Sequence, residues 1–251
     1  ARRGADITLR CAPALHPVLA GGAVRLVAES EGGAPAEAPD FWCPLLSLPG
    51  LVDPRGVAIP EPVHIAIPED SRVLMHRRIA PYAGSFRIGV AWSGEGGERD
   101  DPRAAVPLAC LLPLAALPGV QVFSLQQGAA AAEQHRAGAA GFVVDLGARC
   151  RHFGDTAAAL EQMDLLVACD SAVAQLAGCM GKPVLALLPF NPHWIYGMRG
   201  DATPWYPTMR LLRQKSPGDW ASVCGELLRL VGRWAEIRAR RAPGSCTTLS
   251  P

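Results

Sequence analysis

The stretch DLLVACDSAVAQLAGCMGKPVLALL, residues 164–188, decides the fold. Two short apolar runs, 164–169 and 184–188, enclose an Ala-rich segment, 172–180. Unbroken apolar runs, rather than alternating ones, are typical of strands in a sheet that is covered on both faces. Parallel neighbours need a crossover of about the length of the segment between them, usually a helix. The stretch therefore predicts a strand-helix-strand unit of a parallel α/β fold.

The same alternation extends outward from this unit, from residue 86 to residue 240. We expect further strands at 86–92, 120–126, 142–146 and 209–213, and helices at 108–117, 130–139, 156–162 and 218–240. Before residue 84 the pattern is weaker, with strands at 7–11 and 24–29, helices at 14–20 and 70–79, a Gly/Pro/Ala-rich loop at 30–39 and a Pro-broken apolar segment at 41–48. These elements predict part of a second α/β domain, joined by a linker at 81–85.

Composition indicates a globular chain and argues against a nucleic-acid-binding or membrane-spanning protein. Of 251 residues, 49% are apolar and 19% are charged, and the formal net charge of +1 offers no bulk field for nucleic acid or acidic lipid. The longest apolar stretches, 106–120 and 183–190, are broken by prolines or fall short of the roughly 20 residues that a membrane span needs. Asp6, Arg10 and His16 interrupt the N-terminal apolar stretch, which argues against a secretory signal and favours an interior start cut from a longer chain.

The eight cysteines form no C-x-x-C pair, so neither a zinc site nor a thioredoxin-type motif is expected. Most lie among apolar neighbours, which predicts small core residues. A disulfide framework is not expected in a chain of this length, and the prediction is a reducing, cytoplasmic location.

The sharpest candidate site follows the strand at 164–169. Asp170 or Ser171 is suited to cap the helix that begins at Ala172, and the amides of its first turn, with the positive end of the helix dipole, would suit a phosphate. In parallel sheets, ligands bind beyond the carboxyl ends of the strands. A capped helix without a ligand is the competing interpretation.

Three more polar loops are expected at the same edge, which together suggest a cleft. Trp92, Ser93 and Gly94 begin a Gly-rich loop, Gln126 and Gln127 follow another strand, and Asp155 and Thr156 form the last, although these two could simply cap a helix. The loop after Trp92 lacks the dinucleotide fingerprint, and the segment 178–183 lacks the Ser/Thr of a P-loop.

Aromatic residues follow the strand at 184–188. His193, Trp194 and Tyr196 could stack on a base or cover a cleft, or could simply pack the loop, whereas His152 is expected at the surface. No Ser-His-Asp order, metal cluster or carboxylate pair at catalytic spacing emerges. The residues therefore favour a binding cleft over an identifiable catalyst, and no catalytic residue, metal or cofactor is predicted.

Several spaced motifs resemble the glycosyltransferase module at the C-terminus of bacterial tetratricopeptide-repeat proteins, which is similar to the heptosyltransferases of glycosyltransferase family 9. They are IGVAWSG (88–94), VPLACLLPLAALPGVQVFSLQQG (106–128), GDTAAALEQMDLLVACDSAVAQLAGCMGKPVLALLP (154–189) and PWYPTMRLLRQ (204–214). The match covers roughly residues 5–232.

The resemblance implies a GT-B fold, in which two Rossmann-like domains face a cleft and no metal is required. The domains would be an incomplete acceptor-side domain at 1–83 and a nucleotide-sugar domain at 84–232, with the helix end and tail at 233–251. It assigns the donor diphosphate to Asp170, Ser171 and Ala172, a phosphate-side loop to Ser93 and Gly94, and nucleoside contacts to Gln126 and Gln127. The presumed catalytic base would lie before Ala1.

The chain departs from the family pattern where positive charge is expected. Gln175 stands in place of a histidine, Gln127 precedes Gly128 where the family often has a lysine between them, and Glu95, Ala104 and Ala105 replace an Asn and an Arg-Ser pair, with Arg103 as a displaced substitute. Two hypotheses follow: a glycosyltransferase that moves a sugar from a nucleotide sugar to a hydroxyl acceptor, and a degenerate binding or scaffold module beside tetratricopeptide repeats. A nucleotide-sugar epimerase would need catalytic carboxylates and histidines that the sequence does not identify.

Overall fold

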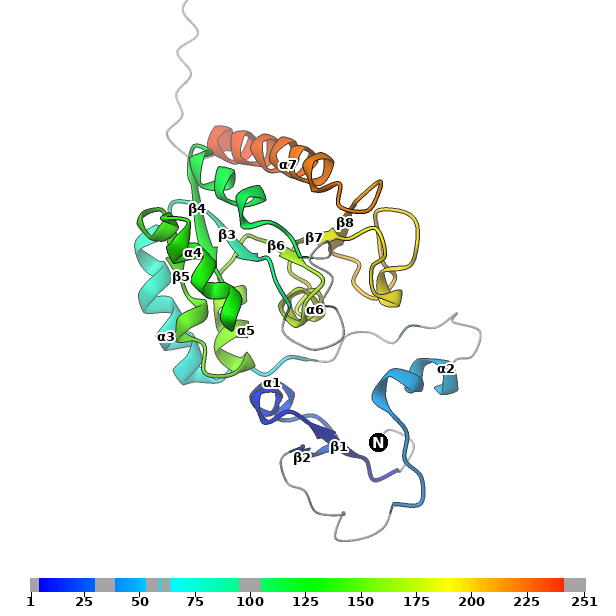
Figure 1. The fold of residues 1–251 in the computed structure, drawn as a ribbon. Helices are drawn as coiled ribbons and strands as arrows, with labels where there is room; N and C mark the ends of the chain where they lie inside the picture. Colours follow the sequence, from blue (N-terminus) through cyan, green and yellow to red (C-terminus); the bar gives the residue numbers. More distant parts are fainter. Residues whose placement is uncertain (1–4, 30–38, 53–58, 60–63, 95–104, 242–251) are drawn as a thin grey trace, which may run out of the picture.

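The computed structural model describes residues 5–29, 39–52, 59, 64–94 and 105–241. Its centre is a parallel sheet of six strands in the order β5-β4-β3-β6-β7-β8 (Figure 1). The strands are β3 Phe86–Ala91, β4 Val120–Ser124, β5 Val143–Asp145, β6 Leu165–Cys169, β7 Val184–Leu188 and β8 Met209–Arg213. All six expected strands of this region are confirmed. The chain order reverses direction between β3 and β6, as in doubly wound Rossmann sheets.

Helical layers cover both faces of this sheet, as the unbroken apolar strands predicted. One core lies beneath α7 (Trp220–Arg241) and the 3-10 helices η4 (Leu108–Cys110) and η5 (Leu112–Ala116). The other lies beneath α3 (Glu69–Ile79), α5 (Phe153–Glu161) and α6 (Ala172–Cys179). Figure 1 shows α7 on one side of the strands and α5 and α6 on the other.

Two expected helices are wrong. The segment 108–117 forms η4 and η5 instead of one α-helix, because Pro113 lacks the amide that a continuous helix would use. The segment 130–139 contains only α4 (Ala132–Arg136), between η6 (Ala129–Ala131) and η7 (Ala139–Gly141). Gly138, which has a φ of 68°, ends it in the left-handed conformation.

The N-terminal part contains a smaller unit. Strands β1 (Thr8–Cys11) and β2 (Arg25–Ala28) pair in parallel, joined by η1 (Pro13–Leu15) and α1 (His16–Leu19). Val18 of α1 shares a core with Met75 of α3. The Val18 carbonyl accepts a hydrogen bond from the amide of Ala66, so this unit packs on the larger domain. The remaining elements before residue 86 are η2 (Leu45–Ser47), α2 (Leu48–Val52) and η3 (Ala80–Tyr82). Phe41 and Trp42, in the Pro-broken segment, are 93% and 82% exposed.

No disulfide was expected from the sequence, and this prediction is wrong for Cys110 and Cys224. The structure joins them by a disulfide between η4 and α7, across 114 residues of sequence. Cys11, Cys43, Cys150, Cys169 and Cys179 are free, and Cys246 lies outside the described residues.

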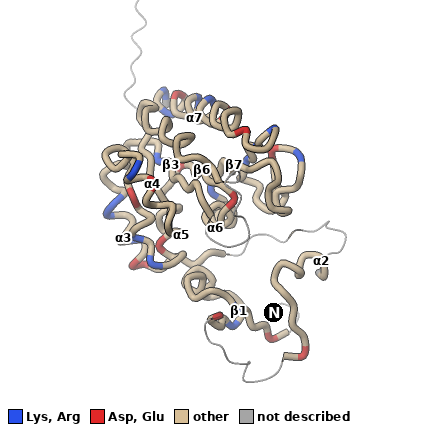
Figure 2. The backbone as a smooth tube through the Cα atoms, viewed as in Figure 1, with Lys and Arg blue, Asp and Glu red and all other residues tan. Residues whose placement is uncertain are grey.

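Charged residues of both signs are spread over the described part of the chain. In Figure 2 basic and acidic positions are interspersed along α7, whereas α3 has its acidic residues in the first turn and basic residues in the last. Among the described helices, none is long and apolar enough to span a membrane. Within the same residues, no group of His, Cys, Asp and Glu is arranged to hold a metal ion.

Candidate functional site

The polar loops after neighbouring strands are in direct contact. The loop after β3 packs on the turn after β6. The two lie so close that a Cβ added to Gly94 would be 3.2 Å from the Asp170 carbonyl oxygen. The turn after β6 in turn meets the loop after β7, since the His193 amide donates to the Asp170 carboxylate at 3.3 Å. β3 and β6 flank the point where the chain order reverses, which is where ligands bind in open α/β sheets. The expected convergence is therefore confirmed for the loops after β3 and β6, and the loop after β7 joins them although the sequence did not predict this.

Gln126 connects the loop after β4 to the loop after β3. Its side chain is 3% exposed, and its Oε1 accepts from the amides of Trp92 and Ser93, both at 2.9 Å. Its Nε2 donates to the carbonyls of Ser93 and Gln127, also at 2.9 Å. Behind it, a Cβ on Gly147 would overlap the Gln126 carbonyl oxygen, so the segment after β5 also lies against this residue. The described bonds of Gln126 hold the edge together, and a contact with nucleoside stays a prediction.

The turn after β6 has the geometry of an open helix start. Ser171 is the N-cap of α6, and its Oγ accepts from the Ala174 amide at 3.4 Å. Ala172, the first residue of the helix, is exposed. Amides at the start of an α-helix have no partner within the helix, so those of Ala172 and Val173 are directed beyond its end. Of the two expected caps, the structure selects Ser171, and Asp170 binds the loop after β7 instead.

Trp92 and Gln175, two further predicted site residues, make hydrogen bonds within the fold. Trp92 is 1% exposed, and its indole Nε1 donates to Glu133 of α4 at 3.1 Å. Gln175 is half-buried one turn into α6, and its amide donates to the Ser171 carbonyl. Glu95, Arg103 and Ala104 lie outside the described residues.

The predicted loop at Asp155 and Thr156 is instead the buried start of α5, and neither residue is its cap. His152, expected at the surface, is half-buried and is the N-cap, with Nδ1 accepting from the Asp155 amide at 3.4 Å. Thr156 is fully buried, and its hydroxyl accepts from Gln127 Nε2 at 3.3 Å. Contact of either residue with a ligand stays a prediction.

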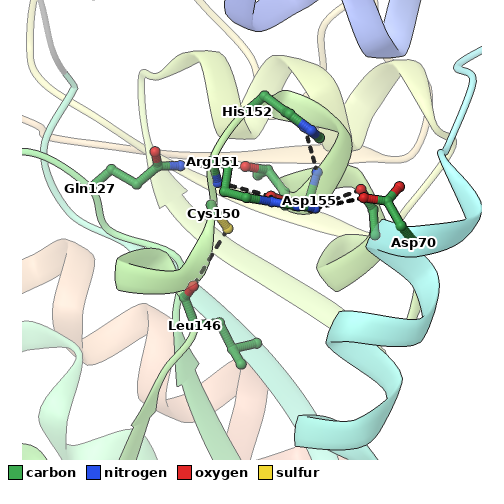
Figure 3. A network of polar contacts seen from close by, with 9 residues as sticks. Asp70, Gln127, Leu146, Cys150, Arg151, His152 and Asp155 are labelled. Carbon is green, nitrogen blue, oxygen red and sulfur yellow. Dashed lines mark hydrogen bonds and ion pairs between the residues drawn. The ribbon is translucent and has the colours of Figure 1, made fainter.

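Asp155 is the centre of a polar network (Figure 3). The Arg151 guanidinium binds both of its carboxylate oxygens and also Asp70 of α3, and Ser71 Oγ donates to Asp155 at 2.7 Å. Burial alone would raise the pKa of Asp155, but the hydrogen bonds from Arg151 and Ser71 outweigh it and hold that pKa well below its usual range. The network fastens α3 to α5 and commits Arg151 to two carboxylates.

The loop after β7 is rigidly fastened. The Arg213 guanidinium donates to the carbonyls of Tyr196, Gly197 and Gly200. Thr203 Oγ1 donates to the Ile195 carbonyl at 2.8 Å. This loop includes η9 (Trp194–Tyr196).

Tyr196 lies in the interior of this loop. Its ring is 1% exposed, and its hydroxyl has no hydrogen-bond partner in good geometry among the described residues. Burial, together with the nearby Asp170 carboxylate, raises the pKa of this phenol.

A separate hollow lies away from this edge. Its volume is about 480 Å³, and its lining includes Tyr82, Gln121, Gln134 and Phe142. The lining also includes all of the edge strand β5, Val143–Asp145, and it contains none of the predicted site residues.

Comparison with solved structures identifies the architecture. ADP-heptose lipopolysaccharide heptosyltransferase II of E. coli superposes with a TM-score of 0.51 and 17% identity over 70% of this chain and 56% of that protein. The fold is of the GT-B type. A glycosyl transferase family 9 protein from Veillonella parvula gives a TM-score of 0.48 and 18% identity, over 66% and 47% of the two chains. E. coli heptosyltransferase WaaC with ADP gives 0.43 and 14%, over 60% and 45%.

This chain thus spans about half the length of the solved structures that it matches. No family model and no curated protein sequence matches it. In this sheet the predicted loops after β3, β4 and β6 lie at the carboxyl ends of parallel strands.

Proposed function

We propose that the chain binds the nucleoside diphosphate of a nucleotide sugar and is the donor-binding part of a glycosyltransferase that transfers the sugar to a hydroxyl acceptor. The observation that carries this proposal is the exposed start of α6 at the reversal point of the sheet, with the loop after β3 packed beside it. Outward-directed amides and the positive end of a helix dipole favour a bound anion. The expected nucleoside contacts, Gln126 and Gln127, belong to the adjacent loop after β4.

Relatives of the same fold are consistent with this choice of ligand. WaaC was solved with ADP, and a more distant match, HepE of Anabaena, was solved with UDP and glucose. We propose that this chain also binds a nucleotide sugar. Heptose as the sugar, the hydroxyl acceptor and tetratricopeptide repeats in a longer protein stay predictions.

A second candidate is a binding or scaffold module without catalysis. The observation that favours it is electrostatic: Gln127 and Gln175 are uncharged, and Arg151 is already paired with Asp70 and Asp155. In a transferase, preorganised donors stabilise the departing diphosphate, and loss of one can cost about 3 kcal/mol of transition-state stabilisation. A sugar nucleotide that is bound and never turned over by the full-length protein would favour this candidate.

Cytoplasmic location is part of the same proposal. The Cys110–Cys224 disulfide gives it a test, because disulfides persist mainly in oxidising compartments. Alkylation of both thiols in protein taken directly from cells would support the cytoplasm.

Calorimetric titration with ADP, UDP and GDP tests the binding claim. Ala172→Glu adds a negative charge at the exposed first residue of α6, where it stabilises a helix but repels a diphosphate. We therefore expect this variant to be as stable as the wild type and to lose diphosphate binding. Ala221→Glu, which adds the same charge to the exposed first turn of α7, is the matched control and should bind normally. Unchanged binding by Ala172→Glu would contradict the site, and absence of binding by the wild type at millimolar diphosphate would contradict the function.

A further inference from the structure

The loop after β7 exposes a tryptophan beside the proposed diphosphate site. Trp194 is 50% exposed. It directly follows His193, whose amide donates to the carboxylate of Asp170 in the turn after β6. Among the described residues of this edge, Phe190 and Met198 of the same loop are also exposed, at 52% and 69%. An exposed indole at a binding edge offers a large apolar face to a ligand.

Two aromatic rings pack against the Trp194 ring. Trp205 packs against it at nearly a right angle, 83°, with ring centroids 5.8 Å apart. His193 lies on it at a tilt of 40° and a centroid distance of 5.4 Å. The backbone carbonyls around η9 are fixed by Thr203 and Arg213. The exposed part of the indole is therefore preorganised, so a ligand that stacks on it pays little ordering entropy.

Strand order says which part of a nucleotide sugar reaches this ring. The proposed nucleoside contacts follow β4, the diphosphate site follows β6, and Trp194 follows β7, and these strands lie in that order across the sheet. A nucleotide sugar is linear, with the diphosphate between the nucleoside and the sugar. With the nucleoside over β4 and the diphosphate over β6, the sugar extends toward β7. One strand spacing, about 4.8 Å, is comparable with the width of a sugar ring.

We propose that Trp194 is the stacking platform for the sugar of the donor, and so a specificity-determining residue of the same site. The inference rests on the proposed function, whose diphosphate fixes the near end of the sugar. The apolar CH face of a pyranose would cover the exposed indole face, and burial of that area supplies the binding free energy. The uncharged platform is indifferent to the nucleoside, so its contribution should appear only when a sugar is attached.

The test compares each diphosphate with its sugar conjugate by calorimetry, using ADP with ADP-glucose, UDP with UDP-glucose and GDP with GDP-mannose. Trp194→Ala should weaken the sugar nucleotide about tenfold, equivalent to about 1.4 kcal/mol, and leave the affinity for the bare diphosphate within about twofold. Trp194→Phe, which keeps an aromatic face, should recover part of the loss. Phe142→Ala removes an exposed aromatic side chain at the opposite edge of the sheet and should bind both ligands normally.

Four outcomes would overturn the proposal. Unchanged sugar-nucleotide affinity in Trp194→Ala would show that the donor sugar lies elsewhere, and equal weakening of both ligands would show damage to the loop rather than loss of a platform. A wild-type chain that binds none of the diphosphates contradicts the proposed function, and the platform falls with it. A wild-type chain that binds a diphosphate but gains nothing from the sugar contradicts the platform alone.

Discussion

Replacement of Gln126 by alanine should destabilise the protein by about 4 kcal/mol. The side chain is 3% exposed and makes four hydrogen bonds to the main chain of residues 92, 93 and 127. Each such bond contributes about 1 kcal/mol net, and loss of the side chain leaves the peptide groups around it without partners. The four bonds together therefore account for about 4 kcal/mol.

Thermal and urea unfolding measure this loss. For a chain of this size, a loss of 4 kcal/mol lowers the unfolding temperature by about 10 °C. Gln126→Met fills a similar volume without hydrogen bonds and should lose nearly as much as alanine. Gln121→Met is the matched control, because the Gln121 side chain is half-buried on β4 and its two bonds among the described residues go to the carbonyls of Val122 and Phe142.

A role confined to nucleoside contact makes the opposite prediction. If Gln126 contacted the nucleoside without joining the two loops, its replacement would lower nucleotide affinity and leave the unfolding temperature almost unchanged. A loss below about 1 kcal/mol in Gln126→Ala would refute the clamp that joins the loops after β3 and β4.

Other perturbations test the packing and the electrostatics that hold the site. The folded pKa of Asp155 is depressed below its ordinary value of 3.8, so the stability that this carboxylate gives the fold is present above about pH 4 and is lost as the pH falls further. Asp155→Asn should therefore lower the free energy of unfolding by about 3 kcal/mol at pH 7. If the difference in unfolding free energy between wild type and variant stayed constant below pH 4, this prediction would be wrong. Gly178→Ala places a Cβ 2.6 Å from the Tyr206 ring and should cost about 1 to 3 kcal/mol in urea unfolding, whereas Gly225→Ala in α7, where a Cβ meets nothing within 4 Å, should be neutral or stabilising; equal effects would contradict the packing. In the oxidised protein, the Cys110–Cys224 disulfide closes a loop across 114 residues, and its reduction should lower the free energy of unfolding by about 4 kcal/mol. After reduction, mass spectrometry should detect two more alkylated thiols than before. No change in either measurement would speak against the bond.

Sequence alone predicted the strands well because each is an unbroken apolar run between polar turns. The bounds expected for β7 and β8 are those of the structure, and α6 differs by one residue. The helices between β3 and β5 were harder. There Pro113 and Gly138 act on local backbone geometry, and the Ala-rich composition alone suggested continuous helix.

The site was predictable as a set of loops and not as a set of roles. The strand ends predicted that the loop of Ser93 and Gly94 meets the turn of Asp170 and Ser171, because the carboxyl ends of parallel strands meet at one edge. Nothing local distinguishes Gln126, whose four bonds go to main chain brought near by the fold, from a glutamine that awaits a ligand.

Long-range partners were the other class that sequence reasoning missed. The pairing of Cys110 with Cys224 and of Asp155 with Ser71 joins residues far apart in the chain, and composition carries no signal for either.

The most direct measurement of the diphosphate site is the backbone amide NMR spectrum during titration with ADP and UDP. A phosphate at the start of α6 should move the amide signals of Ala172 and Val173 strongly, because charge-assisted hydrogen bonds form there. The amides of Ala221 and Ser222, at the start of α7, should not move. Signals at Ala172 and Val173 that stay in place while the ligand binds elsewhere, or while no signal moves at all, would contradict the central claim.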